Sequence, residues 1–225
     1  DQGLGEKVFI IWKNDDVYST GIKDQFVAEA ETLGLEVVGD ATFTTDTSTN
    51  FTVQLTQAQE AGADLIFLPI YYQPASMILT RADQMGYAPE FFGVDGMDGI
   101  LTVEGFDTSL AEGVMLLTPF NADATDDATV SFVTKYQEQW SETPNQFAAD
   151  AYDCIYALKQ ALEETGCTPD MSAADICEAL IGEFPSMTFI GLTGDGEGIT
   201  WDASGAVSKA PKGMVIQDGA YVGMD

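Results

Sequence analysis

Hydrophobic and polar residues alternate between two patterns along the first 120 positions. Short runs that are almost entirely apolar, such as KVFIIW at 7–12, have the length of strands buried on both faces of a sheet. Between them, apolar residues recur every three or four positions, which predicts helices, and glycine follows each helix as a stop signal. The predicted strands are 7–12, 35–43, 64–70, 89–94 and 113–119, and the predicted helices are 19–33, 51–61 and 74–85.

This alternation of strands and helices is typical of right-handed βαβ units. It predicts an α/β fold with a parallel sheet flanked by helices, complete by about residue 121. From there to about residue 205 the pattern favours three helices, at 126–140, 147–164 and 172–181, with little strand between them. This region is expected to be part of a second lobe. A hairpin is predicted at 215–222, where Asp218-Gly219 supplies the turn.

The charge of the chain excludes several functions. Eight Lys and Arg stand against 37 Asp and Glu, which gives a net charge of −29, and there is no histidine. Such a surface repels nucleic acid and anionic membranes, so neither is an expected partner. The lack of histidine disfavours hydrolases and zinc sites. No apolar run is long enough to cross a membrane. We expect no enzyme activity, no cofactor and no metal site. The rival considered is an enzyme on a similar α/β scaffold, in which paired acids such as Asp15/Asp16 and Asp95/Asp98 would hold a metal.

Three cysteines, Cys154, Cys167 and Cys177, match no zinc-binding spacing. They are expected to be mostly buried small hydrophobic residues, and a disulfide between Cys167 and Cys177 is the one pairing considered.

The residues that follow the strands form the candidate site, since ligands of open parallel sheets bind beyond the carboxyl ends of the strands. Residues 14–18, ending in Tyr18, follow the first strand, Tyr71 and Tyr72 follow the third, and Asp95 and Gly96 follow the fourth. A carboxylate beside tyrosine rings suits a small ligand with an ammonium group. The alternative is that these residues only make turns and cover the sheet edge.

The chain resembles the branched-chain amino acid binding proteins of ABC importers, which are type I periplasmic binding proteins. The resemblance rests on an ordered set of segments rather than on one motif. These segments are 7–12 with 14–21, 64–70 with 71–72, 92–96, 147–153, 191–194 and 199–202.

The resemblance implies two α/β lobes with the ligand between them. Residues 1–121 and 206–225 would form the complete second lobe of the family, and 122–205 part of the first lobe, whose N-terminal portion is absent. That portion, or a dimer mate, would cover apolar helix faces exposed in 122–205. Tyr18 and Tyr71 would pack on the ligand with Tyr72 nearby, Asp95 would accept its ammonium, Gly96 would allow close approach, and Phe147 would line the side-chain pocket.

The expected function is that of a solute-binding protein that captures an amino acid, branched-chain or otherwise apolar, by closing two lobes, and delivers it to an ABC permease. The alternative is a sensor of amino acids or amides with the same fold. Either protein would be extracytoplasmic, in the periplasm or on the cell surface as a lipoprotein. Asn50-Phe51-Thr52 also matches the acceptor sequence for N-linked glycosylation. A role of Asn50 as a helix N-cap would account for this sequence without glycosylation.

Overall fold

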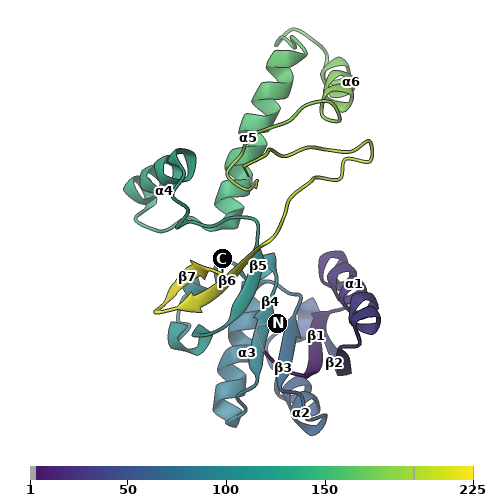
Figure 1. Ribbon diagram of the computed structural model, residues 1–225, viewed down its shortest axis with the longest axis vertical. Coiled ribbons are helices and arrows are strands. Elements are labelled where there is room, and N and C mark those ends of the chain that lie inside the picture. Colours follow the sequence, from purple (N-terminus) through teal and green to yellow (C-terminus); the bar gives the residue numbers. More distant parts are fainter. Residues whose placement is uncertain (1–3, 195, 225) are drawn as a thin grey trace. The chain divides into compact units, whose positions relative to one another are not determined.

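A single seven-stranded sheet organises the protein, with the strand order β2-β1-β3-β4-β5-β6-β7 (Figure 1). The computed structural model describes residues 4–194 and 196–224. Strands β1 to β5 are joined by parallel pairings, as predicted. The strands are β1 (Lys7–Lys13), β2 (Glu36–Phe43), β3 (Leu65–Leu68), β4 (Glu90–Gly93), β5 (Met115–Thr118), β6 (Lys212–Gln217) and β7 (Ala220–Gly223).

The chain divides into two compact units. Unit 1 comprises the residues up to Thr118 together with those from Gly213 onward, and unit 2 comprises Pro119–Lys212. Unit 1 carries the helices α1 (Val17–Leu33), α2 (Thr52–Glu60) and α3 (Tyr72–Met85). Unit 2 carries α4 (Asp127–Trp140), α5 (Gln146–Glu164) and α6 (Ala173–Glu183).

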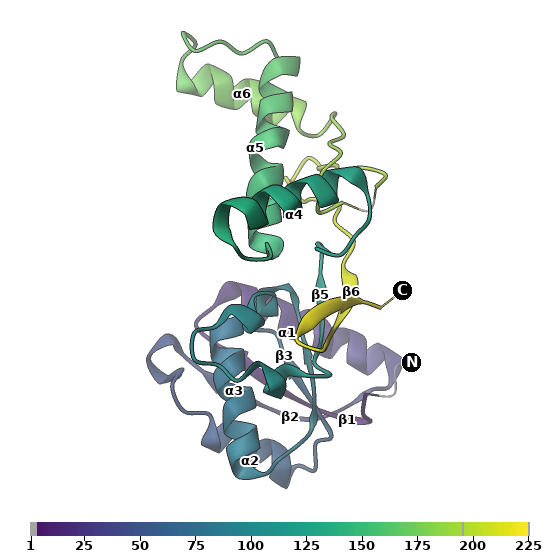
Figure 2. The same ribbon diagram turned by 90° about the vertical axis from the view of Figure 1, so that its left-hand side faces the viewer.

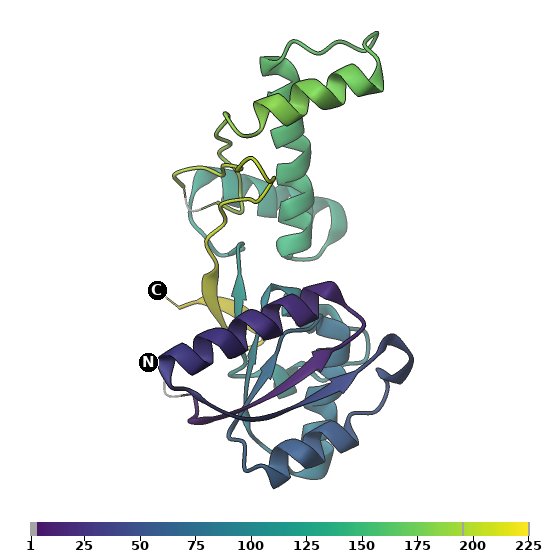
Figure 3. The same cartoon turned by 90° about the vertical axis from the view of Figure 1, so that its right-hand side faces the viewer.

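Helices cover both faces of the sheet in unit 1. Figure 2 shows α3 in front of the sheet, and Figure 3, from the opposite side, shows α1 in front. The α1 side is closed by Ile22 and Phe26, which pack against Val8, Ile10 and Phe67. The other side is a larger core, in which Leu55 of α2 and Ile78 of α3 pack with residues of β1 and β3. Because successive side chains of a strand point to opposite faces of the sheet, each strand contributes side chains to both cores.

Two helices begin two residues earlier than their apolar periodicity predicts. Helix α1 starts at Val17, because a side-chain oxygen of Asp16 accepts the backbone N–H of Tyr18 at 2.9 Å and caps the first turn. Helix α3 starts at Tyr72, with Tyr71 at its N-cap. Tyr18 and Tyr72 therefore lie in first turns of helices, where a helix restricts their direction more than a loop would.

The predicted hairpin is confirmed. Strands β6 and β7 are antiparallel, and Gln217 pairs with Ala220 across a two-residue turn. Asp218 and Gly219 both have positive φ, 53° and 73°, as a tight hairpin turn between right-twisted strands requires.

Unit 2 is built around α5 and has two small hydrophobic clusters. One joins Ala157 and Ala161 to Phe189 and Ile199, and the other surrounds Phe120 and Leu192. Within the described residues between β5 and β6, extended segments form only isolated bridges, at Phe189 with Ile199 and at Trp201 with Val207.

A buried carboxylate holds the loop that follows Phe189. Asp153 of α5 is only 4% exposed. Its oxygens accept the backbone N–H groups of Leu192 and Thr193 and the hydroxyl of Thr193, at 2.8–2.9 Å. Segments 147–153 and 191–194, on which the family resemblance partly rests, are therefore hydrogen-bonded to each other.

Unit 2 exposes apolar side chains along its main helix, as expected for a lobe with few strands. On α5, Phe147, Tyr152, Ile155, Tyr156 and Leu158 are all exposed, and Ile155 reaches 65%.

All three cysteines are free, so the disulfide considered between Cys167 and Cys177 is not formed. Cys154 and Cys177 are exposed, and the expectation that the cysteines are buried is therefore wrong. Their places on the outer faces of α5 and α6 follow from the shortage of partner layers in unit 2. No helix in the described part of the chain is long and apolar enough to span a membrane.

Candidate ligand-binding site

The candidate residues of unit 1 meet because their strands are neighbours. Strands β1, β3 and β4 lie side by side and parallel, so the segments that leave their carboxyl ends share one edge of the sheet. Tyr18, Tyr71 and Asp95 come from these three segments. Tyr18 lies in the first turn of α1, Tyr71 caps α3, and Asp95 begins a short 3₁₀ turn after β4.

Tyr18 and Asp95 form the centre of the cluster. The Tyr18 hydroxyl donates a hydrogen bond of 2.6 Å to Oδ1 of Asp95 and accepts one of 2.9 Å from the backbone N–H of Gly96. Burial raises the pKa of Tyr18, and the carboxylate that takes its hydrogen bond raises it further. The phenol therefore stays protonated and acts as a fixed donor to Asp95.

Tyr71 adds an aromatic face to this pair. Its ring stacks on that of Tyr18 with centroids 4.9 Å apart, and 40% of its surface is exposed. Burial raises the pKa of Tyr71, and the charges of Asp16 and Asp95 add to the shift. Two rings beside a carboxylate can hold a cation through cation–π attraction and a charge-assisted hydrogen bond.

Gly96 is required by the packing of this cluster. A Cβ atom there would lie 2.7 Å from the Tyr18 hydroxyl and 2.9 Å from the carbonyl oxygen of Ile70. The expected reason for glycine was close approach of a ligand. In the structure, the groups that approach its Cα are the tyrosine and the backbone between β3 and α3.

The acidic pair after β1 has structural roles. Oδ2 of Asp15 accepts the backbone N–H of Thr45 at 3.0 Å, which lowers the pKa of Asp15 to about 2, and Lys13 pairs with it at 3.1 Å. Asp16 caps α1. In the part of the chain that the structure describes, no group of three or more acidic or cysteine side chains is placed to hold a metal ion.

Two predicted residues are placed elsewhere. Tyr72 packs against the core on the α2 and α3 side of the sheet, whereas Tyr18 packs on the α1 side. Phe147 belongs to unit 2, in the first turn of α5, and is 38% exposed. Their roles in binding stay predictions.

Tyr221 supports the site and was not predicted. Its hydroxyl accepts the backbone N–H of Gly99 at 2.8 Å, which holds the segment after Asp95 against β7. Burial raises the pKa of Tyr221, and the buried carboxylate of Asp98 raises it further. The alternation of β7 could have indicated that Tyr221 faces inward, but not which loop it meets.

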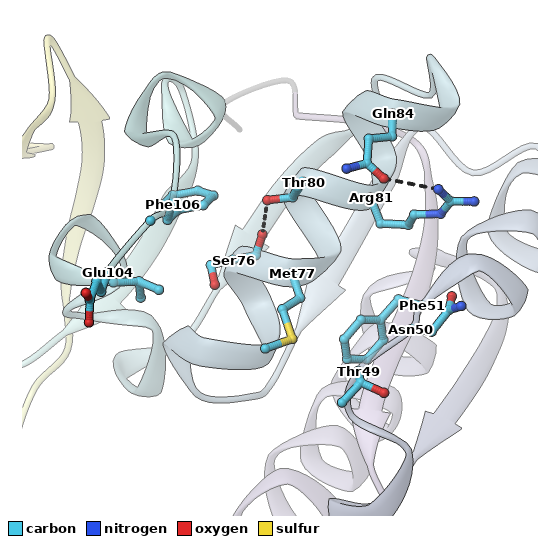
Figure 4. A pocket seen from close by; sticks show the side chains of 12 residues that line it. Thr49, Asn50, Phe51, Ser76, Met77, Thr80, Arg81, Gln84, Glu104 and Phe106 are labelled. Carbon is cyan, nitrogen blue, oxygen red and sulfur yellow. Dashed lines mark hydrogen bonds between the residues drawn. The ribbon is translucent and has the colours of Figure 1, made fainter.

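A separate groove of about 480 Å³ lies between α3 and the segments at 49–51 and 103–106. Figure 4 shows Arg81, Phe51 and Asn50 on one side of it and Glu104 and Phe106 on the other. It contains none of the residues of the Tyr18–Asp95 cluster.

The family model described as "Periplasmic binding protein" matches residues 1–208. The chain belongs to the periplasmic binding protein family. This match confirms the resemblance noted in the sequence, and the family is one of binding proteins rather than enzymes.

Relatives of this periplasmic binding protein include the Leu/Ile/Val-binding protein homolog 4 of Brucella abortus. It is 26% identical over 170 residues, covering 72% of this chain and 39% of the relative. Similar solved structures include the leucine-binding protein LivK of Thermotoga maritima, with a TM-score of 0.80 at 22% identity. The substrate-binding protein LivJ of Streptococcus pneumoniae, in complex with isoleucine, has a TM-score of 0.80 at 25% identity.

Each of these two structures is matched by 98% of this chain, which covers 60% of its length. The likeness confirms the predicted fold class, with one lobe and part of another. The chain thus spans 39% of the curated relative and 60% of each of these structures.

Proposed function

We propose that the chain is part of the solute-binding protein of an ABC importer and that it captures an amino acid with a branched-chain or other apolar side chain. The observation that carries the proposal is the Asp95 carboxylate, held by Tyr18 at 2.6 Å beside the exposed ring of Tyr71. Relatives named for leucine, isoleucine and valine support the choice of ligand.

Asp95 would accept the ligand's α-ammonium group. The Tyr18 hydroxyl fixes one carboxylate oxygen, so the carboxylate does not have to be ordered when the ligand arrives. The exposed face of Tyr71 would contact the ammonium and the first carbons of the side chain. Tyr72 would lie nearby, Gly96 would let the backbone approach closely, and Phe147 would contact the apolar side chain.

The proposed action is binding and release without covalent chemistry. A ligand that contacts both lobes favours the closed arrangement, because only a difference in affinity between two states can shift their populations. The closed protein would then deliver the amino acid to a permease.

A sensor of amino acids or amides is the second candidate, because its binding step would use the same residues. A permease gene beside this one, and uptake that stops when this gene is deleted, would support import. Intact uptake after deletion, together with a lost signalling response, would support the sensor.

The exposed apolar side chains of α5 support a further part of the proposal. We propose that the N-terminal segment of a longer protein, or a dimer mate, covers them, since exposed apolar area of this kind usually marks an interface. The protein would act in the periplasm or at the cell surface as a lipoprotein.

Calorimetric titration tests the function directly. Leucine, valine, phenylalanine and glutamate would be titrated into the longer protein and into this chain alone. We expect the longer protein to bind leucine or valine more tightly than glutamate. Binding of no amino acid by either would remove the assignment and leave the family.

Asp95→Asn is the decisive variant. It removes the charge that pairs with the ammonium, and we expect affinity to fall about 10- to 100-fold, which corresponds to about 1.5–3 kcal/mol. Asp46→Asn is the matched control. Asp46 also lies in a 3₁₀ turn, but it is exposed and is far from Asp95 in the sequence. Equal affinities for both variants would contradict the role of Asp95.

A further inference from the structure

The acceptor sequence Asn50-Phe51-Thr52 lies outside the binding cluster, and the structure changes its interpretation. Helix α2 begins at Thr52, with Phe51 as its N-cap residue. Asn50 is therefore one residue before the cap, and the expectation that it is the N-cap is wrong. Asn50 is exposed, whereas Phe51 is 1% exposed and packs in the core.

Asn50 and Thr52 are bonded to each other in a defined geometry. Oδ1 of Asn50 accepts the backbone N–H of Thr52 at 3.0 Å and the Thr52 hydroxyl at 2.6 Å. Nε of Arg81 donates to the Thr52 hydroxyl oxygen at 2.8 Å. Since a hydroxyl has one hydrogen, Arg81 occupies an acceptor site of Thr52 and its hydrogen goes to Asn50.

In this arrangement the turn uses only the side-chain oxygen of Asn50, and not its amide nitrogen. Both bonds use Oδ1, and among the described residues Nδ2 has no hydrogen-bond partner. An aspartate would form the same turn. The chain has 37 Asp and Glu but only four Asn, so asparagine is the less common of the two residue types that could form this turn, and it is the one found here. The fold accounts for the carbonyl of Asn50 but not for its nitrogen.

We propose that Asn50 is the acceptor of an N-linked glycan. The co-reactant is an oligosaccharide linked through phosphate to a lipid. A bond forms between Nδ2 and the anomeric carbon of the first sugar, the bond from that carbon to the phosphate oxygen breaks, and the phosphate leaves with the electron pair. The proton lost from Nδ2 passes to a base of the transferase. The motif needs Thr or Ser two residues after Asn and any residue but proline between them, as here.

The position fits a modification that leaves ligand binding intact. Asn50 lines the rim of the groove beside α3, with Arg81 on the same side (Figure 4). This groove shares no residue with the Tyr18–Asp95 cluster, so a glycan attached there would not replace a contact of the site. The family is extracytoplasmic, and an N-glycosylation acceptor is typically found on the surface of a secreted protein.

Mass spectrometry of protein purified from the cells that naturally make it tests the proposal. Cleavage after glutamate releases residues 37–60, which contain the whole motif. We expect this peptide to carry added mass equal to whole sugars, located on Asn50 by fragmentation. The same chain produced in a bacterial cytoplasm supplies the unmodified reference.

Variants made in the same cells distinguish the effect of the acceptor sequence from the effect of the turn. Asn50→Asp keeps the turn and should lose the added mass, Thr52→Ser should retain it, and Thr52→Val should lose it. Amino-acid affinity of Asn50→Asp should stay within about twofold of the parent protein. An unmodified Asn50 in all of the natural protein would overturn the proposal, and so would added mass that persists in Asn50→Asp.

Discussion

The hydroxyl of Tyr18 joins Asp95, 77 residues away, through a 2.6 Å hydrogen bond, and the same oxygen accepts the backbone N–H of the next residue, Gly96. One side chain thus sets both the carboxylate that we propose binds the ligand and the turn that carries it. The link crosses from the start of α1 to the end of β4, so it depends on the order of strands in the sheet.

Tyr18→Phe should weaken both stability and binding. It removes the donor to Asp95 and leaves the Gly96 N–H without its acceptor, which we expect to cost about 1–3 kcal/mol of unfolding free energy. Urea unfolding measures the first effect and calorimetry the second. Tyr136→Phe is the control, because Tyr136 lies on α4 of unit 2 and is not among the proposed binding residues. A loss of affinity no greater than in this control would contradict the role of Tyr18.

Gly96→Ala should destabilise unit 1, because its Cβ would lie 2.7 Å from the Tyr18 hydroxyl and 2.9 Å from the Ile70 carbonyl. We expect a loss of about 1–3 kcal/mol, typical of overpacking. Gly21→Ala is the matched control: no atom lies within 4 Å of its added Cβ, and Gly21 lies inside α1. That control should gain about 0.5–1 kcal/mol. Thermal unfolding of both variants tests the contrast, and equal shifts would refute it.

Asp153→Asn should loosen the loop at 191–193. The carboxylate accepts three hydrogen bonds there, and in either orientation an amide would turn its NH₂ group toward at least one of these donors. We expect a loss of about 2–3 kcal/mol and faster amide hydrogen exchange at Leu192 and Thr193. Asp170→Asn, at an exposed position, should change stability by less than about 0.5 kcal/mol.

Asp15 should contribute to the pH dependence of stability. Its pKa falls from an ordinary value of 3.8 to about 2 because its carboxylate accepts the Thr45 N–H. A lowered folded-state pKa stabilises the protein above pH 3.8, and this contribution is lost as pH falls through 2.

Comparison with Asp15→Asn isolates this effect from the general relief of charge repulsion in acid. The difference in unfolding free energy between the parent protein and the variant should be constant above about pH 5 and shrink as pH falls from about 4 to 2. Denaturant titrations over that range measure it. A difference that stays constant down to pH 2 would show that the carboxylate of Asp15 is not held by Thr45.

Sequence patterns alone were enough to predict the alternation of strands and helices, the parallel sheet and the hairpin at Asp218-Gly219. These follow from local periodicity and turn chemistry, which depend on residues within about ten positions of each other. The sequence also indicated that Tyr18, Tyr71 and Asp95 follow strands that end at one edge, and its ordered segments indicated the family.

Which of these residues meet, and why, became known only from the folded arrangement. Tyr72 packs on the opposite face of the sheet from Tyr18, because the start of α3 sets the direction of its side chain. Gly96 accommodates Tyr18 and the Ile70 carbonyl, and Tyr221 bonds to the backbone 122 residues before it. Such relationships join residues far apart in sequence, and their geometry exists only once the sheet has brought them together.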